Sequence, residues 1–284
     1  MLIVCLCAAA YAGERISATE AENARTEKQA SGYLDVGGAK IYYETRGSGP
    51  AIVLLHDGLL SSVTWDEVWE PLPTKHRVIR YDRRGYGRSE LPRSSYSSVE
   101  DLRELLAHGG ALAIDFAIAH REMVDGLFLI GPVLHGIEFS EQFLERARRN
   151  NEPMERGDVK AWATNWSQDR FLIAGAKEAA RRRIYEQLVE NAEKLRKFDA
   201  ALEEKLSPPA SQRLSEIKAP TLILAGVADI ADVHAQCRAI DSGISKSERI
   251  VVKDAGHLIQ LEKPDEIVKK VENFAQRCER KRAR

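Results

Sequence analysis

Two short segments, each with both polar and apolar residues, flank a tight turn near the start of the region where secondary structure can be predicted. Residues 33–36 and 40–45 read as strands on either side of Gly37-Gly38. A Gly-Gly pair accepts the positive φ angles of a two-residue hairpin turn. The pattern therefore predicts an antiparallel hairpin at the start of a folded domain.

Continuous apolar runs follow the hairpin. They are short, rich in β-branched side chains and separated by helical patterns, which is typical of strands buried on both faces in a parallel sheet. We expect these strands at residues 51–55, 78–81, 126–130, 220–225 and 249–252. We expect helices between them at residues 99–108, 111–120, 233–240 and, after Pro264, 265–277.

A longer segment interrupts this alternation. Residues 134–215 are charged, poor in strand patterns and carry large apolar side chains at helical spacings: Trp162, Trp166, Phe171, Ile184, Leu188 and Leu195. We predict a helical cap inserted between two strands of the sheet. Its aromatic side chains either pack between its helices, the interpretation we favour, or line a substrate pocket.

The first residues have a different character. Residues 1–12 are apolar and end in Ala10-Tyr11-Ala12, as in the apolar region and cleavage site of a secretory signal, although a positively charged start is missing. The run is too short to span a membrane. We predict export, with a cytoplasmic location as the alternative, and a linker over 13–31. In an oxidising compartment Cys237 and Cys278 become candidates for a disulfide.

Composition limits the classes of protein that the chain can belong to. The 284 residues are 44% hydrophobic and 30% charged, with a formal net charge of -1. These values suit one sizeable domain, with a core over 32–133 and 216–279 and a basic tail at 280–284. Basic residues are interspersed with acidic ones apart from short runs, so we predict no nucleic-acid partner. No cysteine and histidine cluster has the spacing of a zinc site, and we expect no metal.

Candidate chemistry lies where apolar runs end. In an open α/β sheet, ligands bind at the carboxyl ends of the strands, because loops converge there. His56-Asp57-Gly58 follows one run, while Asp229 and His257 follow two later runs, 28 residues apart. This order suits a carboxylate that orients an imidazole base. The backbone amides of Gly58 and Leu59 are candidate donors to an oxyanion.

Taken together, these segments resemble the α/β-hydrolase superfamily, in the branch of small esterases, lactonases and carbon-carbon hydrolases with a helical cap. The similarity spans about residues 33–279 and rests on four motifs in the family's order: 56–65, 81–89, 226–229 and 256–257. The resemblance implies that Asp229 is the triad acid, that His257 is the base and that no cofactor is needed. It also implies an architectural, not catalytic, role for Asp82, Arg84 and Ser89.

One motif of the family is missing. Its members carry the nucleophile in a Gly-x-Ser-x-Gly turn between a strand and a helix. Here residues 101–108 run directly into Gly109-Gly110 and a second helical pattern, so about a dozen residues, roughly one strand and a turn, are absent. We therefore expect one central strand to be missing, and the strands of Val53 and Leu127 to become neighbours. The two helices either fuse across Gly109-Gly110 or kink there.

Three interpretations follow for function. The chain is a hydrolase of esters, lactones or similar acyl compounds with a replaced nucleophile, a damaged or mispredicted form of such an enzyme, or a non-catalytic relative that binds a small molecule. Ser61 and Ser62 are the nearest candidates for a replacement nucleophile, ahead of Ser89 and Asp57. The substrate and the oligomeric state are left open by the sequence.

Overall fold

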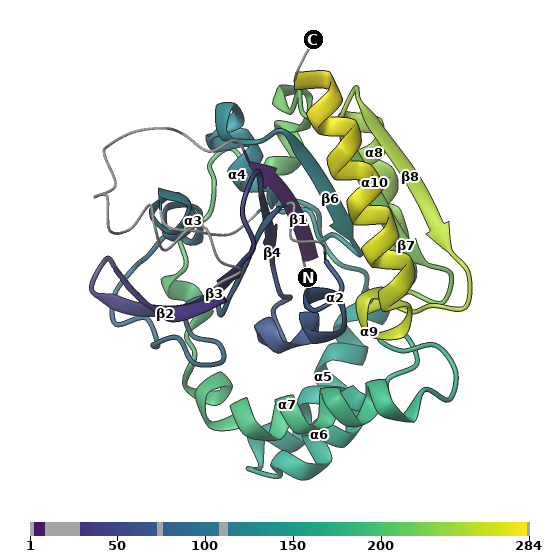
Figure 1. Ribbon diagram of the computed structural model, residues 1–284. Coiled ribbons are helices and arrows are strands. Elements are labelled where there is room, and N and C mark those ends of the chain that lie inside the picture. Colours follow the sequence, from purple (N-terminus) through teal and green to yellow (C-terminus); the bar gives the residue numbers. More distant parts are fainter. Residues whose placement is uncertain (1–2, 9–28, 73–75, 108–112, 283–284) are drawn as a thin grey trace.

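A computed structural model of the protein describes residues 3–8, 29–72, 76–107 and 113–282. Within these residues the centre of the fold is an eight-stranded sheet in the order β2-β3-β5-β4-β1-β6-β7-β8. Helices cover both faces of the sheet, and a further group of helices lies at one end of it (Figure 1). The alternation of apolar runs and helical patterns predicts such a mostly parallel sheet between helices, and the arrangement is the α/β-hydrolase fold that the resemblance implies.

The strands lie where the sequence predicts them, with one addition. Six of the eight run in one direction, while β3 and β1 run against their neighbours. The short apolar runs form strands that are buried along nearly their whole length. The bounds are β1 Ile3–Ala8, β2 Ala30–Val36, β3 Ala39–Arg46, β4 Ala51–Leu54, β5 Arg77–Tyr81, β6 Gly126–Ile130, β7 Thr221–Gly226 and β8 Ser247–Val252.

The centre of the sheet differs from the prediction. The strands of Val53 and Leu127, β4 and β6, are not neighbours, because β1 lies between them and pairs antiparallel with both. Leu6 stands opposite Val53 on one side and Leu127 on the other. The physical reason is that the facing edges of β4 and β6 carry backbone N–H and C=O groups that need partners in a buried sheet. A third strand satisfies both edges.

Two hydrophobic clusters cover the two faces of the sheet, because successive side chains of each strand point to opposite faces. On one face lie η1 (Ser62–Trp65), α2 (Asp66–Trp69), α9 (Ile259–Glu262) and α10 (Pro264–Arg282). On the other lie α3 (Ser98–Ala107), α4 (Ala113–Ala119) and α8 (Ala231–Gly243), with η2 (Arg121–Met123) leading into β6. The four predicted helices thus correspond to α3, α4, α8 and α10.

The predicted candidates for a disulfide lie on opposite sides of the sheet. Cys237 of α8 is buried in one cluster and Cys278 of α10 in the other, and no disulfide joins them. A disulfide needs Cα atoms within about 7 Å, which a sheet between the two side chains prevents. The pairing suggested by the sequence is therefore absent from the fold.

The segment between β6 and β7 is helical, as its pattern predicts. It contains α5 (Glu141–Glu155), α6 (Val159–Ser167) and α7 (Glu178–Lys197), followed by η3 (Ala200–Leu202), η4 (Ala210–Gln212) and η5 (Leu214–Glu216). We call α5–α7 with their connections the helical insertion. Figure 1 shows these helices together at the lower end of the sheet. Trp162, Trp166, Ile184 and Leu188 are buried, as expected of packing residues, and both tryptophans donate to Asn151 Oδ1.

Several predictions fall on residues outside the described ranges. They include the Gly109-Gly110 junction between α3 and α4 and most of the 13–31 linker. The run predicted as a signal peptide contains β1, so a mature chain that begins at Gly13 would lack the central strand. Residues 280–282 of the predicted basic tail continue α10. No helix in the described part of the chain has both the length and the apolar composition needed to cross a membrane.

Candidate active site

The structure brings together the two residues that the sequence singles out as acid and base. Asp229 follows β7 and His257 follows β8, and these strands are parallel neighbours, so their carboxyl ends meet at one edge of the sheet. His257 Nδ1 lies 2.8 Å from Asp229 Oδ2, and both side chains are buried. A carboxylate accepts hydrogen bonds, so this contact places the imidazole proton on Nδ1 and leaves Nε2 as the acceptor.

Backbone contacts fix the two partners in place. Asp229 Oδ1 accepts the amide of Ile230 at 2.8 Å, which holds the carboxylate at the start of α8. Gly131, with φ +52°, lies against the imidazole ring just after β6. A Cβ at Gly131 would lie 2.6 Å from His257 Cε1, so only glycine fits beside the ring. Gly131 was not singled out from the sequence, although a glycine that ends a buried strand is a signal of close backbone approach.

The free side of the imidazole is the place where a nucleophile would be expected. His257 Nε2 is buried and has no hydrogen-bond partner among the described residues. A buried, unpartnered nitrogen is unusual, because it forfeits hydrogen bonds that water would supply. The imidazole therefore has the anchoring of a catalytic base and an open acceptor position.

The four serine and aspartate candidates for a replacement nucleophile contact other groups. Ser61 Oγ lies 3.4 Å from Gln187 Oε1, and Ser62 Oγ accepts a hydrogen bond from Arg88. Ser89 Oγ accepts the amide of Tyr42 and donates to the Asp82 carbonyl. Asp57 Oδ1 accepts the amides of Leu59 and Leu60. None of these contacts involves His257.

The turn after β4 contains the two candidate oxyanion donors. The Leu59 amide donates to Asp57 Oδ1 at 2.6 Å, so it is already committed to the turn, and this geometry does not favour Leu59 as a donor to substrate. The Gly58 amide has no such partner among the described residues, and the Tyr86 hydroxyl lies near Gly58. Gly58 is therefore the better of the two candidates.

His56 is held as a neutral imidazole. Its Nε2 accepts the backbone amide of Arg83 at 2.8 Å, and its Nδ1 lies 2.7 Å from the Asp57 carbonyl oxygen. Burial, with a smaller contribution from the Arg83 charge, lowers the pKa of His56 to about 4. Both ring nitrogens are in use, so His56 fixes the turn and is not free to act as a base.

The loop after β5 has the architectural contacts that the resemblance implies. Asp82 accepts the amides of Ser62 and Arg88. Burial raises the pKa of Asp82, but the charge of His56 once it is protonated in acid, the Arg88 charge and these hydrogen bonds lower it below its ordinary value. Arg84 forms a buried ion pair with Asp101 of α3. These contacts and the bond from Arg84 to the Val36 carbonyl tie the loop to η1, to α3 and to the hairpin, and none of them involves Asp229 or His257.

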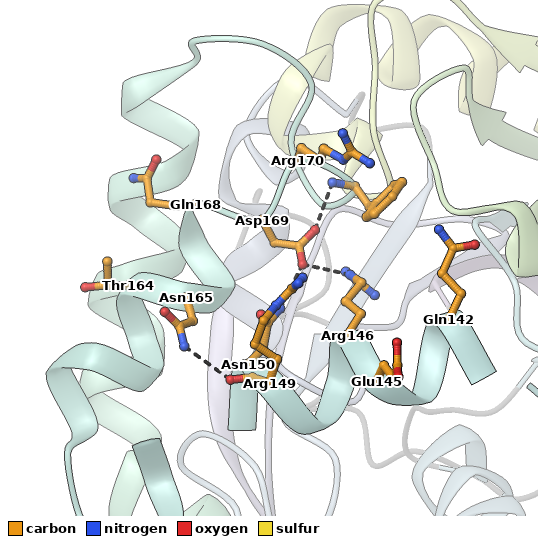
Figure 2. Close-up of a pocket in the computed structure, with 11 residues that line it drawn as sticks. Gln142, Glu145, Arg146, Arg149, Asn150, Thr164, Asn165, Gln168, Asp169 and Arg170 are labelled. Carbon is orange, nitrogen blue, oxygen red and sulfur yellow. Dashed lines mark hydrogen bonds and ion pairs between the residues drawn. The ribbon is translucent and has the colours of Figure 1, made fainter. Parts of the chain in front are cut away.

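Two surface clefts are formed by residues other than Asp229 and His257. One of about 530 Å³ is lined by polar side chains of α5, α6 and the turn that follows α6; Figure 2 shows Asp169 at its centre, between Arg146 and Arg170. A second of about 500 Å³ is lined by residues that include Ser61, Asp82 and Lys194. Neither is lined by Asp229 or His257. Among the described residues, no three His, Cys, Asp or Glu side chains are grouped to hold a metal ion.

Comparison with known proteins bears on the whole core. Residues 52–270 match the family model described as alpha/beta hydrolase family, which covers more than half of the chain. The chain belongs to this family. It is 33% identical over 145 residues to an uncharacterised hydrolase, YraK, of Bacillus subtilis (strain 168), covering 43% of this chain and 54% of that protein. It is 31% identical over 146 residues to a soluble epoxide hydrolase of Corynebacterium sp. (strain C12), covering 45% and 51%.

These alignments span about half the length of the curated relatives. Solved structures extend the likeness to most of the chain at lower identity. The enol-lactonase from Burkholderia xenovorans LB400 superposes with a TM-score of 0.68 at 21% identity, covering 86% of this chain and 100% of that one. A thermophilic esterase from Thermogutta terrifontis gives a TM-score of 0.68 at 21% identity, covering 88% and 99%. At such identity these neighbours establish the fold.

Proposed function

We propose that this member of the alpha/beta hydrolase family hydrolyses a carboxylic ester or lactone through Asp229 and His257 without the family's serine nucleophile. The observation that carries the proposal is the anchored imidazole: Nδ1 is bonded to a buried carboxylate, and Nε2 is buried and unpartnered among the described residues. The similar proteins support hydrolysis as the reaction class. They include an epoxide hydrolase among the curated relatives, and a lactonase and an esterase among the solved structures.

The proposed step uses water in place of a serine. His257 Nε2 takes a proton from a water molecule, whose oxygen forms a bond to the acyl carbon, and the carbonyl electrons move to the oxygen. The Gly58 amide is the candidate donor to that oxyanion. The intermediate collapses, the bond to the leaving oxygen breaks, and the imidazolium returns its proton to that oxygen, giving an acid and an alcohol. Asp229 stabilises the imidazolium.

General-base catalysis alone limits the rate. Proton transfer by a positioned side chain contributes typically about 10²- to 10⁴-fold, well below what a complete triad achieves. We therefore expect slow turnover of activated esters that depends on His257, without accumulation of an acyl-enzyme. Such weak activity also fits a chain that has lost its nucleophile from an active parent.

The test combines a covalent probe with ester hydrolysis. Purified full-length protein is treated with a fluorophosphonate, which modifies activated serines, and adducts are sought by intact mass and peptide mapping. Hydrolysis of a p-nitrophenyl ester is measured beside it, with His257→Ala and Asp229→Asn as the variants. We expect no adduct, and hydrolysis that is lowered about 10²-fold or more by His257→Ala.

Two outcomes would contradict the proposal in different ways. A single serine adduct that is lost in His257→Ala identifies a relocated nucleophile and replaces the water mechanism. Hydrolysis that is equal in wild type and His257→Ala, in proteins that unfold cooperatively, removes the catalytic role. The second outcome favours the alternative function, a small-molecule-binding relative, for which the 530 Å³ cleft offers a place to bind.

A further inference from the structure

The loop that carries His257 is bonded to the helical insertion. Residues 169–177, which connect α6 to α7 and which we call the strap, run beside this loop. The His257 amide donates to the Phe171 carbonyl at 2.7 Å, and the Leu258 amide donates to the Leu172 carbonyl at 3.0 Å. A Cβ at Gly256 would lie 2.8 Å from both carbonyl oxygens, so the two segments are in close backbone contact.

Glu262 makes a second connection between the same two segments. Its side chain has no exposed surface. Glu262 Oε2 accepts the amide of Gly256 at 2.6 Å, while Oε1 accepts the amide of Ala174 at 2.8 Å and Lys177 Nζ at 3.0 Å. One carboxylate thus binds the residue before His257 and two residues of the strap.

Lys177 also contacts the loop at a residue with a left-handed backbone. Asp254 has φ +51°, in the left-handed region that side chains other than glycine seldom adopt. Lys177 Nζ donates to the Asp254 carbonyl at 2.9 Å. The loop conformation that presents His257 is therefore held by contacts from the insertion as well as by its own sequence.

At its other end the strap is fixed by Asp169. Asp169 Oδ1 accepts the Phe171 amide at 2.8 Å, and Oδ2 accepts Arg146 Nε at 2.7 Å and Asn150 Nδ2 at 2.8 Å (Figure 2). Arg146, Asn150 and Asp169 are all buried. Removing one partner of such a buried pair leaves a charge without compensation, so these contacts stabilise the observed position of this end of the strap.

We propose that Asp169 and Glu262 are positioning residues for His257, acting through the strap. Asp169 accepts the amide of Phe171, a residue whose carbonyl group holds the His257 amide, and Glu262 accepts the amide of Gly256, the residue before His257. The direction of His257 Nε2 is thereby set by the insertion and not by the sheet alone. The catalytic consequence rests on the proposed function, whereas the structural consequence does not.

The test uses two carboxamide variants and a matched control. Asp169→Asn and Glu262→Gln keep the size of the side chain and replace an acceptor oxygen with a donor that faces other donors. At Glu262 these include the Gly256 and Ala174 amides, and at Asp169 they are the Phe171 amide and the Arg146 and Asn150 side chains. Asp101→Asn is the control, because Asp101 forms an equally buried ion pair with Arg84 on the opposite face of the sheet. Amide hydrogen exchange is measured by NMR for His257 and Leu258, relative to the amides of β7, which report global opening.

We expect exchange of the His257 and Leu258 amides to rise at least tenfold relative to β7 in both strap variants and to stay unchanged in Asp101→Asn. Ester hydrolysis should fall in the same two variants, and the deficit should lie in kcat more than in KM. Unchanged relative exchange in folded Asp169→Asn and Glu262→Gln overturns the proposal. If Asp169→Asn does not fold, Glu262→Gln alone decides.

The two proposals fail separately. Faster exchange in the strap variants of a protein whose hydrolysis does not depend on His257 keeps the positioning role of the strap and removes the catalytic one. Hydrolysis that depends on His257 but is insensitive to both strap variants keeps the catalytic role of His257 and removes the positioning role of the strap. Amide exchange therefore tests whether the strap positions His257, and the His257→Ala variant tests whether His257 is needed for hydrolysis.

Discussion

Gly131 is the residue whose replacement most directly tests how the imidazole is held. An alanine at φ +52° costs about 1–2 kcal/mol in stability, and its Cβ would meet the His257 ring at 2.6 Å. A displacement of the base by about 1 Å costs on the order of 10²-fold in rate. We expect Gly131→Ala to lower ester hydrolysis about 10²-fold while the protein remains folded.

Gly157 offers the matched control. It has φ +77° and no atom within 4 Å of a Cβ. Gly157→Ala should therefore lose only the stability that the positive φ angle costs, measured in a urea titration, and keep full hydrolysis. If both variants hydrolyse the ester at the same rate, the contact between Gly131 and the imidazole does not position the base.

His56 gives a pH dependence with a definite sign. The pKa of His56 in the folded protein, about 4, lies below the ordinary histidine value of about 6.5, so the unfolded chain takes up the proton first as pH falls. The free energy of unfolding is unaffected by His56 above pH about 6.5 and falls between there and pH about 4, by about 3 kcal/mol in total. The stabilising contribution is thus present at neutral pH and lost in acid.

Two measurements check this behaviour. An NMR titration should show the His56 ring neutral down to pH about 5, and urea unfolding of wild type should lose about 2 kcal/mol more stability than His56→Gln between pH about 7.5 and about 5. A His56 titration midpoint above pH 6 would contradict the neutral assignment and the bonding of both ring nitrogens that supports it.

The role of a single residue could be predicted only where its contacts follow from the order of the strands, and not where they depend on side-chain geometry or on a distant part of the sequence. Asp229 and His257 follow neighbouring parallel strands, so chain order and strand ends were enough to predict their pairing. The sequence could not rank Gly58 against Leu59, because the ranking depends on which amide the Asp57 side chain accepts. Glu262 was missed because its role depends on Ala174, 88 residues away in the insertion.

Among the elements, β1 has the strongest influence on the sheet. Leu6 lies between Val53 and Leu127, whereas Ile3 is the first residue of the strand. Proline cannot donate to a ladder and is tolerated at the first residue of a strand but not in a central one. We expect Leu6→Pro to destabilise the protein by at least about 1–3 kcal/mol, the cost of a buried group left unpaired.

Ile3→Pro is the control, because it introduces the same residue at the first position of β1, where proline is tolerated. It should shift the urea midpoint much less than Leu6→Pro. Equal midpoints for wild type and Leu6→Pro would show that β1 does not contribute to the stability of the sheet, and β4 and β6 would then have to pair in another way.

The strand β1 was not predicted, because its sequence pattern allows two structures. The five apolar runs and four helical patterns of the core were found because burial on both faces and amphipathic spacing are local signals. An apolar run that ends in Ala-x-Ala is equally typical of an exported signal and of a buried strand. Its place in the sheet depends on the open edges of β4 and β6, which lie far along the chain.

At the scale of the whole molecule, export by a cleaved signal would remove the first residues, whereas the described fold contains them as β1. Cleavage after Ala12 removes β1 and exposes two facing strand edges in the centre of the sheet. Several unpaired groups at about 1–3 kcal/mol each are comparable with the roughly 5–15 kcal/mol that stabilises a domain. We expect residues 13–284 to unfold without a cooperative transition, whereas the full chain melts cooperatively.

The measurement is thermal unfolding of both chains by circular dichroism, together with the N-terminal mass of protein recovered from exporting cells. A non-cooperative 13–284 fragment and an uncleaved N-terminus would establish β1 as part of the working fold, because the sheet then needs it. Cooperative melting of residues 13–284 with an unchanged midpoint would contradict this role. It would mean that the sheet closes by pairing β4 with β6, so that residues 1–12 are free to serve as a signal.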